Sequence, residues 1–150
     1  SLGCKEIITV GGLATGELEA LPKTIGAVTD KSVMDKYKDL NVDFKAGEKV
    51  GYIVGAAGLL LGLGKERGMK GVCLLGETSG FPIVTDPKAA ETVLKTLTKM
   101  IGIGVDMKKL DSRVKDMEKF IEKVEDLQKR ALLQMTKEMK PPKEDTRYIG

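Results

Sequence analysis

The sequence predicts an α/β domain of three layers, α/β/α, around a mostly parallel sheet, followed by a long carboxyl-terminal helix. Short apolar runs alternate with segments of helical periodicity, which is the pattern of strands joined by covering helices. The run 71–75 is short enough for a buried strand, and a glycine-containing turn leads from it to the helix start Asp86-Pro87. The 34 residues from 107 to 140 then carry an apolar helical repeat.

The first half of the domain is predicted to contain most of the strands. Four short runs rich in β-forming residues predict strands over residues 5–10, 25–28, 42–44 and 50–54. The first strand is expected to end at Gly11-Gly12. A short helix over 32–40 should follow the second strand, with Asp30 or Ser32 as its N-cap.

Two helices flank the 71–75 strand in the second half. The helix over 56–68 is expected to bury one face, formed by Leu59, Leu60 and Leu63. The helix over 87–101 repeats apolar residues at helical spacing, at positions Ala90, Val93, Leu94, Leu97 and Ile101. Gly102 and Gly104 should terminate it.

The last helix is predicted to run from the cap residue Asp106 to Pro141. At ~1.5 Å per residue it would be ~50 Å long, which exceeds the width of a small domain. An apolar stripe in its second half therefore needs a partner. The predicted contacts of a homo-oligomer are Met117, Ile121, Val124, Ala131 and Met135. The resulting organisation is an α/β domain over 1–106, a helix over 107–140 and a flexible tail over 141–150.

Composition excludes several kinds of chemistry. Histidine is absent, which removes Ser-His and Cys-His nucleophiles and histidine-based metal sites. Cys4 and Cys73 lack metal-ligand spacing. The sequence therefore predicts no catalytic residue, no metal and no cofactor. This points to a binding protein.

Charge and hydropathy exclude two classes of partner. Residues 107–150 hold 12 basic and 9 acidic side chains with their signs interleaved, so nucleic acid is not an expected partner. No apolar run reaches the roughly 18 residues that a membrane span needs. We expect a cytoplasmic protein without a membrane partner.

Glycine-containing turns offer the alternative of an enzyme. Backbone amides at such turns, next to helix amino termini, suit anions and phosphates. The candidate ligand-binding residues are Gly55, Gly58, Gly76, Glu77, Thr78 and Ser79. None of the turns matches a phosphate-binding loop or a dinucleotide fingerprint. The alternative function is a hydrolase or a nucleotide- or phosphate-binding enzyme. The competing structural interpretation is that the glycines allow tight packing and that Glu77 makes a structural hydrogen bond.

Several segments follow one another in a recognisable order: GYIVGAAGLLL at 51–61, GVCLLGETSG at 71–80, DPKAA at 86–90 and IGVD at 103–106. In this succession the chain resembles the archaeal proteasome-assembly-chaperone family, whose members have sometimes been labelled ATP-grasp. The resemblance covers most of residues 5–125.

The resemblance implies a phosphorylase- or hydrolase-like sheet and a non-enzymatic role in binding proteasome α subunits or a similar ring, to assist assembly or to cap it. Family members are longer at the amino terminus, so the chain is interpreted as a carboxyl-terminal portion that lacks amino-terminal strands. Some relatives bind the α-ring through a carboxyl-terminal hydrophobic-tyrosine-any motif. The candidate partner-binding residues are therefore Tyr148, Ile149 and Gly150. The match is inexact, because Arg147 stands at the hydrophobic position.

Overall fold

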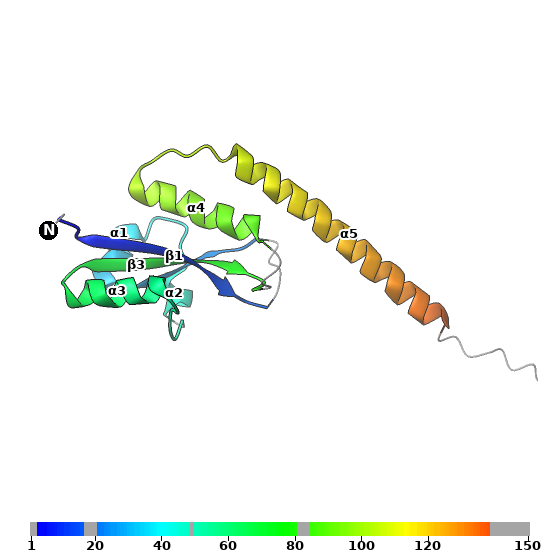
Figure 1. Ribbon diagram of the computed structural model, residues 1–150, viewed down its shortest axis with the longest axis horizontal. Helices are drawn as coiled ribbons and strands as arrows, with labels where there is room; N and C mark the ends of the chain where they lie inside the picture. Colours follow the sequence, from blue (N-terminus) through cyan, green and yellow to red (C-terminus); the bar gives the residue numbers. More distant parts are fainter. Residues whose placement is uncertain (1–2, 17–20, 49, 81–84, 139–150) are drawn as a thin grey trace, which may run out of the picture. The chain divides into compact units, whose positions relative to one another are not determined.

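The computed structural model describes residues 3–16, 21–48, 50–80 and 85–138 (Figure 1). The elements are β1 (Glu6–Ala14), β2 (Thr24–Val28), α1 (Lys31–Tyr37), α2 (Phe44–Gly47), α3 (Ala56–Glu66), β3 (Lys70–Thr78), α4 (Pro87–Ile101) and α5 (Lys108–Glu138). The chain divides into two compact units, Ser1–Val114 and Lys115–Gly150. The first unit contains the sheet and α1 to α4, and the second contains most of α5.

The described sheet has three strands in the order β1-β3-β2. The β1 and β3 strands are parallel, whereas β2 is antiparallel to β3. The α/β class is confirmed, but these three strands form a mixed sheet instead of a mostly parallel one. Nine residues connect β1 to β2, and a connection this short cannot contain a crossover helix that would return the chain in the same direction.

Helices pack on both faces of β3, which is the central strand. Residues 71 to 76 of β3 are buried. Val72 and Leu74 contact one cluster of buried residues, which includes Val33 of α1 and Val93 of α4. The alternate residues on β3 belong to a second cluster that includes Leu61 of α3. The period-two alternation of a strand thus divides the core into two halves.

The α4 helix agrees closely with the sequence prediction. Asp86 Oδ1 accepts a hydrogen bond from Ala89 N at 3.0 Å, and Pro87 occupies the first turn. At the other end, Gly102 adopts a left-handed conformation with φ of 68°. The N-cap of α1 is also confirmed, since Asp30 Oδ1 accepts from Ser32 N at 2.8 Å.

The expected buried face of α3 is wrong. Leu59, Leu60 and Leu63 are 63%, 52% and 46% exposed, whereas Leu61 and Gly64 are buried. A Cβ built on Gly64 would lie 2.4 Å from Ile7 Cδ1. The helix therefore packs on the sheet through a side that includes glycine, which lets the backbones approach, and its leucines lie outside.

Two predicted strands are also wrong. At 42–44 the chain forms an isolated bridge from Asp43 to Ile25, and α2 begins immediately afterwards, because Asp43 Oδ1 caps Ala46 N at 2.8 Å. Residues 50–54 form no strand. The bridge still has a structural role, since Asp43 O accepts from Gly26 N at 3.2 Å and so covers the outer edge of β2.

The α2 helix fits against β2 only because Gly47 has no side chain. A Cβ on Gly47 would lie 1.8 Å from Gly26 O, so we expect Gly47→Ala to lower the free energy of unfolding by about 2 kcal/mol or more, as overpacking does. Gly62→Ala is the matched control, since it is exposed in α3 with no atom within 4 Å of its Cβ. It should be neutral or stabilising by up to about 1 kcal/mol. Urea unfolding of both variants measures the difference, and equal effects would contradict the proposed packing.

Candidate functional site

The glycine-containing segment after residue 75 is mostly strand. The β3 strand continues to Thr78, and its residues Gly76, Glu77 and Thr78 pair with residues 12 to 14 of β1. The expected end of β1 at Gly11-Gly12 is wrong for the same reason. Strand pairing continues through these glycines, so they serve close packing and do not form turns.

Glu77 has a structural role in the described residues. Its Oε2 accepts a hydrogen bond from Lys23 N at 2.8 Å, and its own N–H donates to Lys23 O at 3.2 Å. These two bonds hold the chain that enters β2 against the end of β3. The carboxylate is thereby used as an acceptor, which favours the structural interpretation of Glu77 over a catalytic one. Ser79, another of the candidate ligand-binding residues, is buried.

The structure separates the remaining candidates onto two faces of the sheet. Gly55 precedes α3 with φ of 80°, and a Cβ on Gly58 would lie 2.0 Å from Ile53 O. A Cβ on Gly76 would instead contact Val93 of α4. Gly55 and Gly58 therefore belong to the α3 face, and Gly76 to the α4 face, so the six candidates do not form one pocket.

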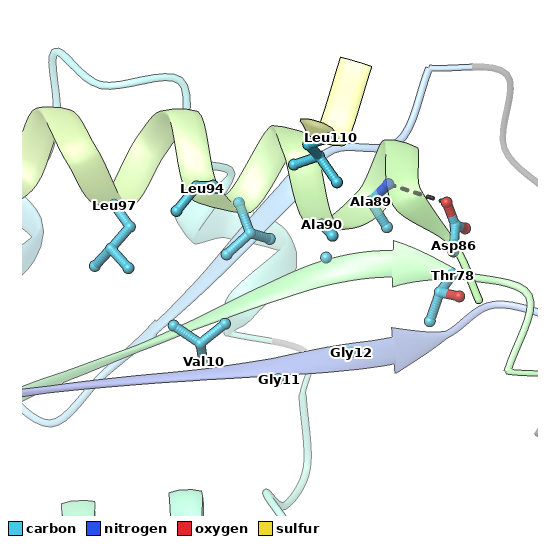
Figure 2. A pocket seen from close by; sticks show the side chains of 12 residues that line it. Val10, Gly11, Gly12, Thr78, Asp86, Ala89, Ala90, Leu94, Leu97 and Leu110 are labelled. Carbon is cyan, nitrogen blue, oxygen red and sulfur yellow. Dashed lines mark hydrogen bonds between the residues drawn. The ribbon is translucent and has the colours of Figure 1, made fainter. Parts of the chain in front are cut away.

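A groove of about 440 Å³ lies between the α4 face of the sheet and α4 (Figure 2). The lining residues are Val10, Gly11, Gly12, Gly76, Thr78, Asp86, Ala89, Ala90, Val93, Leu94, Leu97 and Leu110. Asp86 supplies the only charged side chain of this lining, and its carboxylate accepts the Ala89 amide. The groove is therefore suited to apolar side chains and not to a phosphate.

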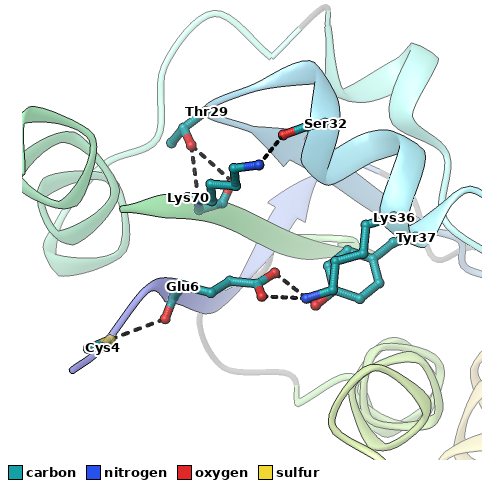
Figure 3. Close-up of polar contacts among 8 residues, drawn as sticks. Cys4, Glu6, Thr29, Ser32, Lys36, Tyr37 and Lys70 are labelled. Atoms are coloured by element: carbon teal, nitrogen blue, oxygen red, sulfur yellow. Dashed lines mark hydrogen bonds and ion pairs between the residues drawn. The ribbon is translucent and has the colours of Figure 1, made fainter. Parts of the chain in front are cut away.

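A second hollow, of about 570 Å³, was not found by sequence reasoning. It lies where β1 and β3 begin (Figure 3). Its lining residues are Cys4, Lys5, Glu6, Ser32, Val33, Lys36, Arg67, Gly68, Met69 and Lys70. Four of these side chains are basic and one is acidic. Residues from three separate parts of the chain contribute, so no local sequence signal marks this basic hollow.

Glu6 organises the polar contacts of the basic hollow. Its carboxylate accepts from Lys36 Nζ at 2.5 Å and from Tyr37 Oη at 2.8 Å. Partial burial raises the pKa of Glu6, but the hydrogen bonds from Lys36 and Tyr37 and the nearby charges of Lys36 and Lys70 outweigh it, so the pKa lies below its ordinary value. Lys70 in turn donates to Ser32 Oγ at 2.7 Å.

Within the described ranges, no group of three or more His, Cys, Asp or Glu side chains could hold a metal ion. Among the same residues, no helix combines the length and apolar character that crossing a membrane requires.

Comparison with known proteins decides the family. The model of the PAC2 family matches residues 1–125. The chain belongs to the PAC2 family. A protein of Methanocaldococcus jannaschii, MJ1210, is 39% identical over 148 residues, which span 99% of this chain and 55% of that protein. None of the matches described here carries the ATP-grasp label.

Solved structures from Pyrococcus furiosus share the fold. PbaB, described as an archaeal proteasome activator, is 44% identical with a TM-score of 0.70, over 81% of this chain and 51% of PbaB. PbaA, described as an archaeal homolog of proteasome-assembly chaperone, is 26% identical with a TM-score of 0.66, over 89% of this chain and 54% of PbaA. This PAC2 chain thus spans about half the length of these relatives.

The contacts of Glu6 predict a pH-dependent stability. A carboxyl group with a lowered pKa stabilises the fold above its unfolded pKa and loses this contribution as the pH falls through its folded pKa. We therefore expect Glu6→Gln to lower the free energy of unfolding at pH 7, and the difference from the parent protein to shrink as the pH falls through the lowered pKa of Glu6. Urea unfolding at pH 7 and at about pH 3 measures it. Glu122→Gln, at an exposed position of α5, is the control, and a gap independent of pH would contradict the prediction.

Proposed function

We propose that this PAC2 protein is a non-enzymatic, cytoplasmic component of the proteasome machinery that binds proteasome α subunits or a similar ring to assist assembly or to cap it. The similarity to PbaB carries the proposal, since 44% identity and a TM-score of 0.70 relate this chain to a proteasome activator. The similarity to PbaA, a homolog of an assembly chaperone, agrees with it.

The candidate site supports binding over catalysis. The groove beside α4 is lined mainly by aliphatic residues and glycine, and the Glu77 carboxylate holds Lys23 N. A general acid-base mechanism needs a positioned proton donor and acceptor around a reacting atom. The six predicted ligand-binding residues lie on different faces of the sheet and do not supply that arrangement.

The α5 helix is proposed as the contact between copies. Met117, Ile121 and Val124 are partly buried and recur at a spacing of three to four residues. Phe120 and Leu127 are 55% and 64% exposed, which widens the apolar surface. Ala131 is exposed and continues the repeat, whereas the side chain of Met135 lies outside the described residues.

Self-association would strengthen a weak contact with a ring. An oligomer presents several copies of the same binding segment, and linked contacts gain avidity when their spacing matches the partner. The proposed segment is the carboxyl end, Tyr148-Ile149-Gly150, which lies outside the described residues. A free carboxylate beside a tyrosine and an aliphatic residue suits a pocket that contains a lysine.

The proteasome contact is tested by a pull-down with archaeal-type α subunits. We expect the full chain to capture them, and we expect Tyr148→Ala or deletion of residues 148–150 to reduce capture about tenfold or more, as the loss of an anchoring aromatic does. Failure of the full, oligomeric chain to bind would sink the proposal. Binding that is unchanged by the tail variants would move the contact to another surface and leave the proteasome role intact.

The oligomer contact is tested by charge substitution on α5. We expect Ile121→Glu and Val124→Lys to weaken self-association, because each places a charge on the apolar stripe. Glu122→Lys and Lys123→Glu change charge at exposed positions of the same helix and serve as matched controls. Sedimentation velocity over a range of concentrations measures the effect. A monomeric parent chain at high micromolar concentration would exclude this contact.

A further inference from the structure

The basic hollow carries more positive charge than its own carboxylate neutralises. Its lining includes four cationic side chains, Lys5, Lys36, Arg67 and Lys70. Glu6, the one acidic residue of the lining, forms an ion pair with Lys36. Among the described residues, Arg67 Nη1 donates to a backbone carbonyl of its own helix at 3.1 Å, and Lys70 Nζ donates to the Ser32 hydroxyl at 2.7 Å. Both cations are thus bonded to neutral acceptors.

The excess of positive charge is local to this end of the sheet. Residues 1–106 contain 13 basic and 13 acidic side chains, so the α/β part of the chain has no net charge. The carboxylate of Asp30 also lies near Lys70, but the charge of Lys65 offsets it. A concentration of one sign of charge around a hollow attracts partners of the opposite sign.

The four cations lie in two pairs around the amino ends of β1 and β3. Glu6 and Lys70 are register partners, so their side chains point to the same face of the sheet, where Lys36 of α1 contacts Glu6 (Figure 3). Lys5 precedes Glu6 by one residue, so strand alternation directs its side chain to the opposite face. Arg67 is the C-cap of α3, which packs on that opposite face.

The backbone amides of the turn after α3 are already used. The N–H groups of Arg67 and Met69 donate to Gly64 O at 3.0 and 2.9 Å, and the Gly68 N–H donates to Lys65 O at 3.0 Å. Compact phosphate sites use such amides as a concave cradle. Here long side chains on two sides of the sheet end are left to bind an anion. This arrangement suits carboxylates spaced along a chain better than one compact phosphate.

We propose that the basic hollow binds an acidic segment of a partner protein that carries Asp or Glu on at least two residues. One carboxylate binds Lys36 and Lys70, and a second binds Lys5 and Arg67. The Arg67 guanidinium can hold a carboxylate through two parallel N–H donors. The volume of about 570 Å³ lies within the range of ligand pockets in proteins. The site uses no residue of α5 or of the carboxyl end, so the inference does not depend on proteasome binding.

Fluorescence anisotropy with a labelled acidic peptide tests the site. The probe is the peptide Gly-Glu-Ala-Glu-Ala-Glu-Gly, and the same peptide with Gln in place of each Glu is its neutral control. We expect the full chain to bind the probe and not the control. The double variant Lys5→Gln with Arg67→Gln should weaken binding at least ~10-fold, because it removes charge-assisted hydrogen bonds.

A matched double variant separates the hollow from a general effect of charge. Lys45→Gln with Lys99→Gln removes the same charge at exposed positions outside the lining, and should leave the affinity within ~2-fold, since distant surface charges are screened by salt. In the described residues, neither Lys5 nor Arg67 bonds through its side chain to another element. Both double variants should therefore keep the Tm of the parent chain.

Cys4 gives a second readout in the unsubstituted chain. It is exposed and lines the basic hollow, so bound probe peptide should slow the alkylation of its thiol by iodoacetamide in proportion to occupancy. The neutral peptide should leave this rate unchanged.

Four outcomes would overturn the proposal. The parent chain could fail to bind the probe, or the two double variants could lose affinity equally, which would indicate a general charge effect. An alkylation rate of Cys4 that is unchanged at saturating probe would place the peptide elsewhere. Tighter binding of tripolyphosphate or of a thymidine oligonucleotide than of the probe, weakened by the Lys5 and Arg67 substitutions, would identify phosphate as the ligand.

Discussion

Burial of β3 is the constraint on which the rest of the first unit depends. Val72, Cys73 and Leu74 have no measurable exposure, and a strand buried this completely needs a neighbour on each edge and a layer on each face. The β1 and β2 strands supply the edges, and α3 and α4 supply much of the two faces. The helices approach the sheet closely, at Gly64 on one face and at Gly76 on the other.

Local signals in the sequence predicted the elements whose ends are fixed by local chemistry. The N-caps Asp30 and Asp86 accept hydrogen bonds from residues two or three positions further along the chain, and Gly102 adopts the left-handed conformation that ends α4. These local effects can be predicted without knowledge of the tertiary structure. The buried side of α3 could not be found in this way. Leucine is more apolar than glycine, so the sequence predicted a buried leucine face. In the structure Gly64 faces Ile7 instead, because the short distance between the helix and the sheet determines which side of α3 is buried. The end of β1 was predicted wrongly for a similar reason, since the partner strand β3 determines that pairing continues through Gly12.

The candidate site shows the same division. Sequence reasoning selected Glu77 from its place near a strand end and also weighed a hydrogen-bonding role for it, which is the role favoured by the bonds to Lys23. It missed the basic hollow because Lys5, Lys36 and Lys70 come together only through the sheet and α1. The family was accessible from sequence, since an ordered succession of short segments survives where single catalytic motifs are absent, and the match over residues 1–125 agrees with that.

The two cysteines have a practical consequence for following this molecule in solution. Cys4 is exposed at the rim of the basic hollow, where its Sγ donates to Glu6 O at 3.3 Å. Cys73 is buried in the central strand, and burial raises the pKa of its thiol. A maleimide reagent should therefore label one thiol in the native protein and two after global unfolding. The mass of the labelled protein then distinguishes folded molecules, with one label, from unfolded molecules, with two. A fluorophore on Cys4 would also report on the beginning of β1 without any engineered residue.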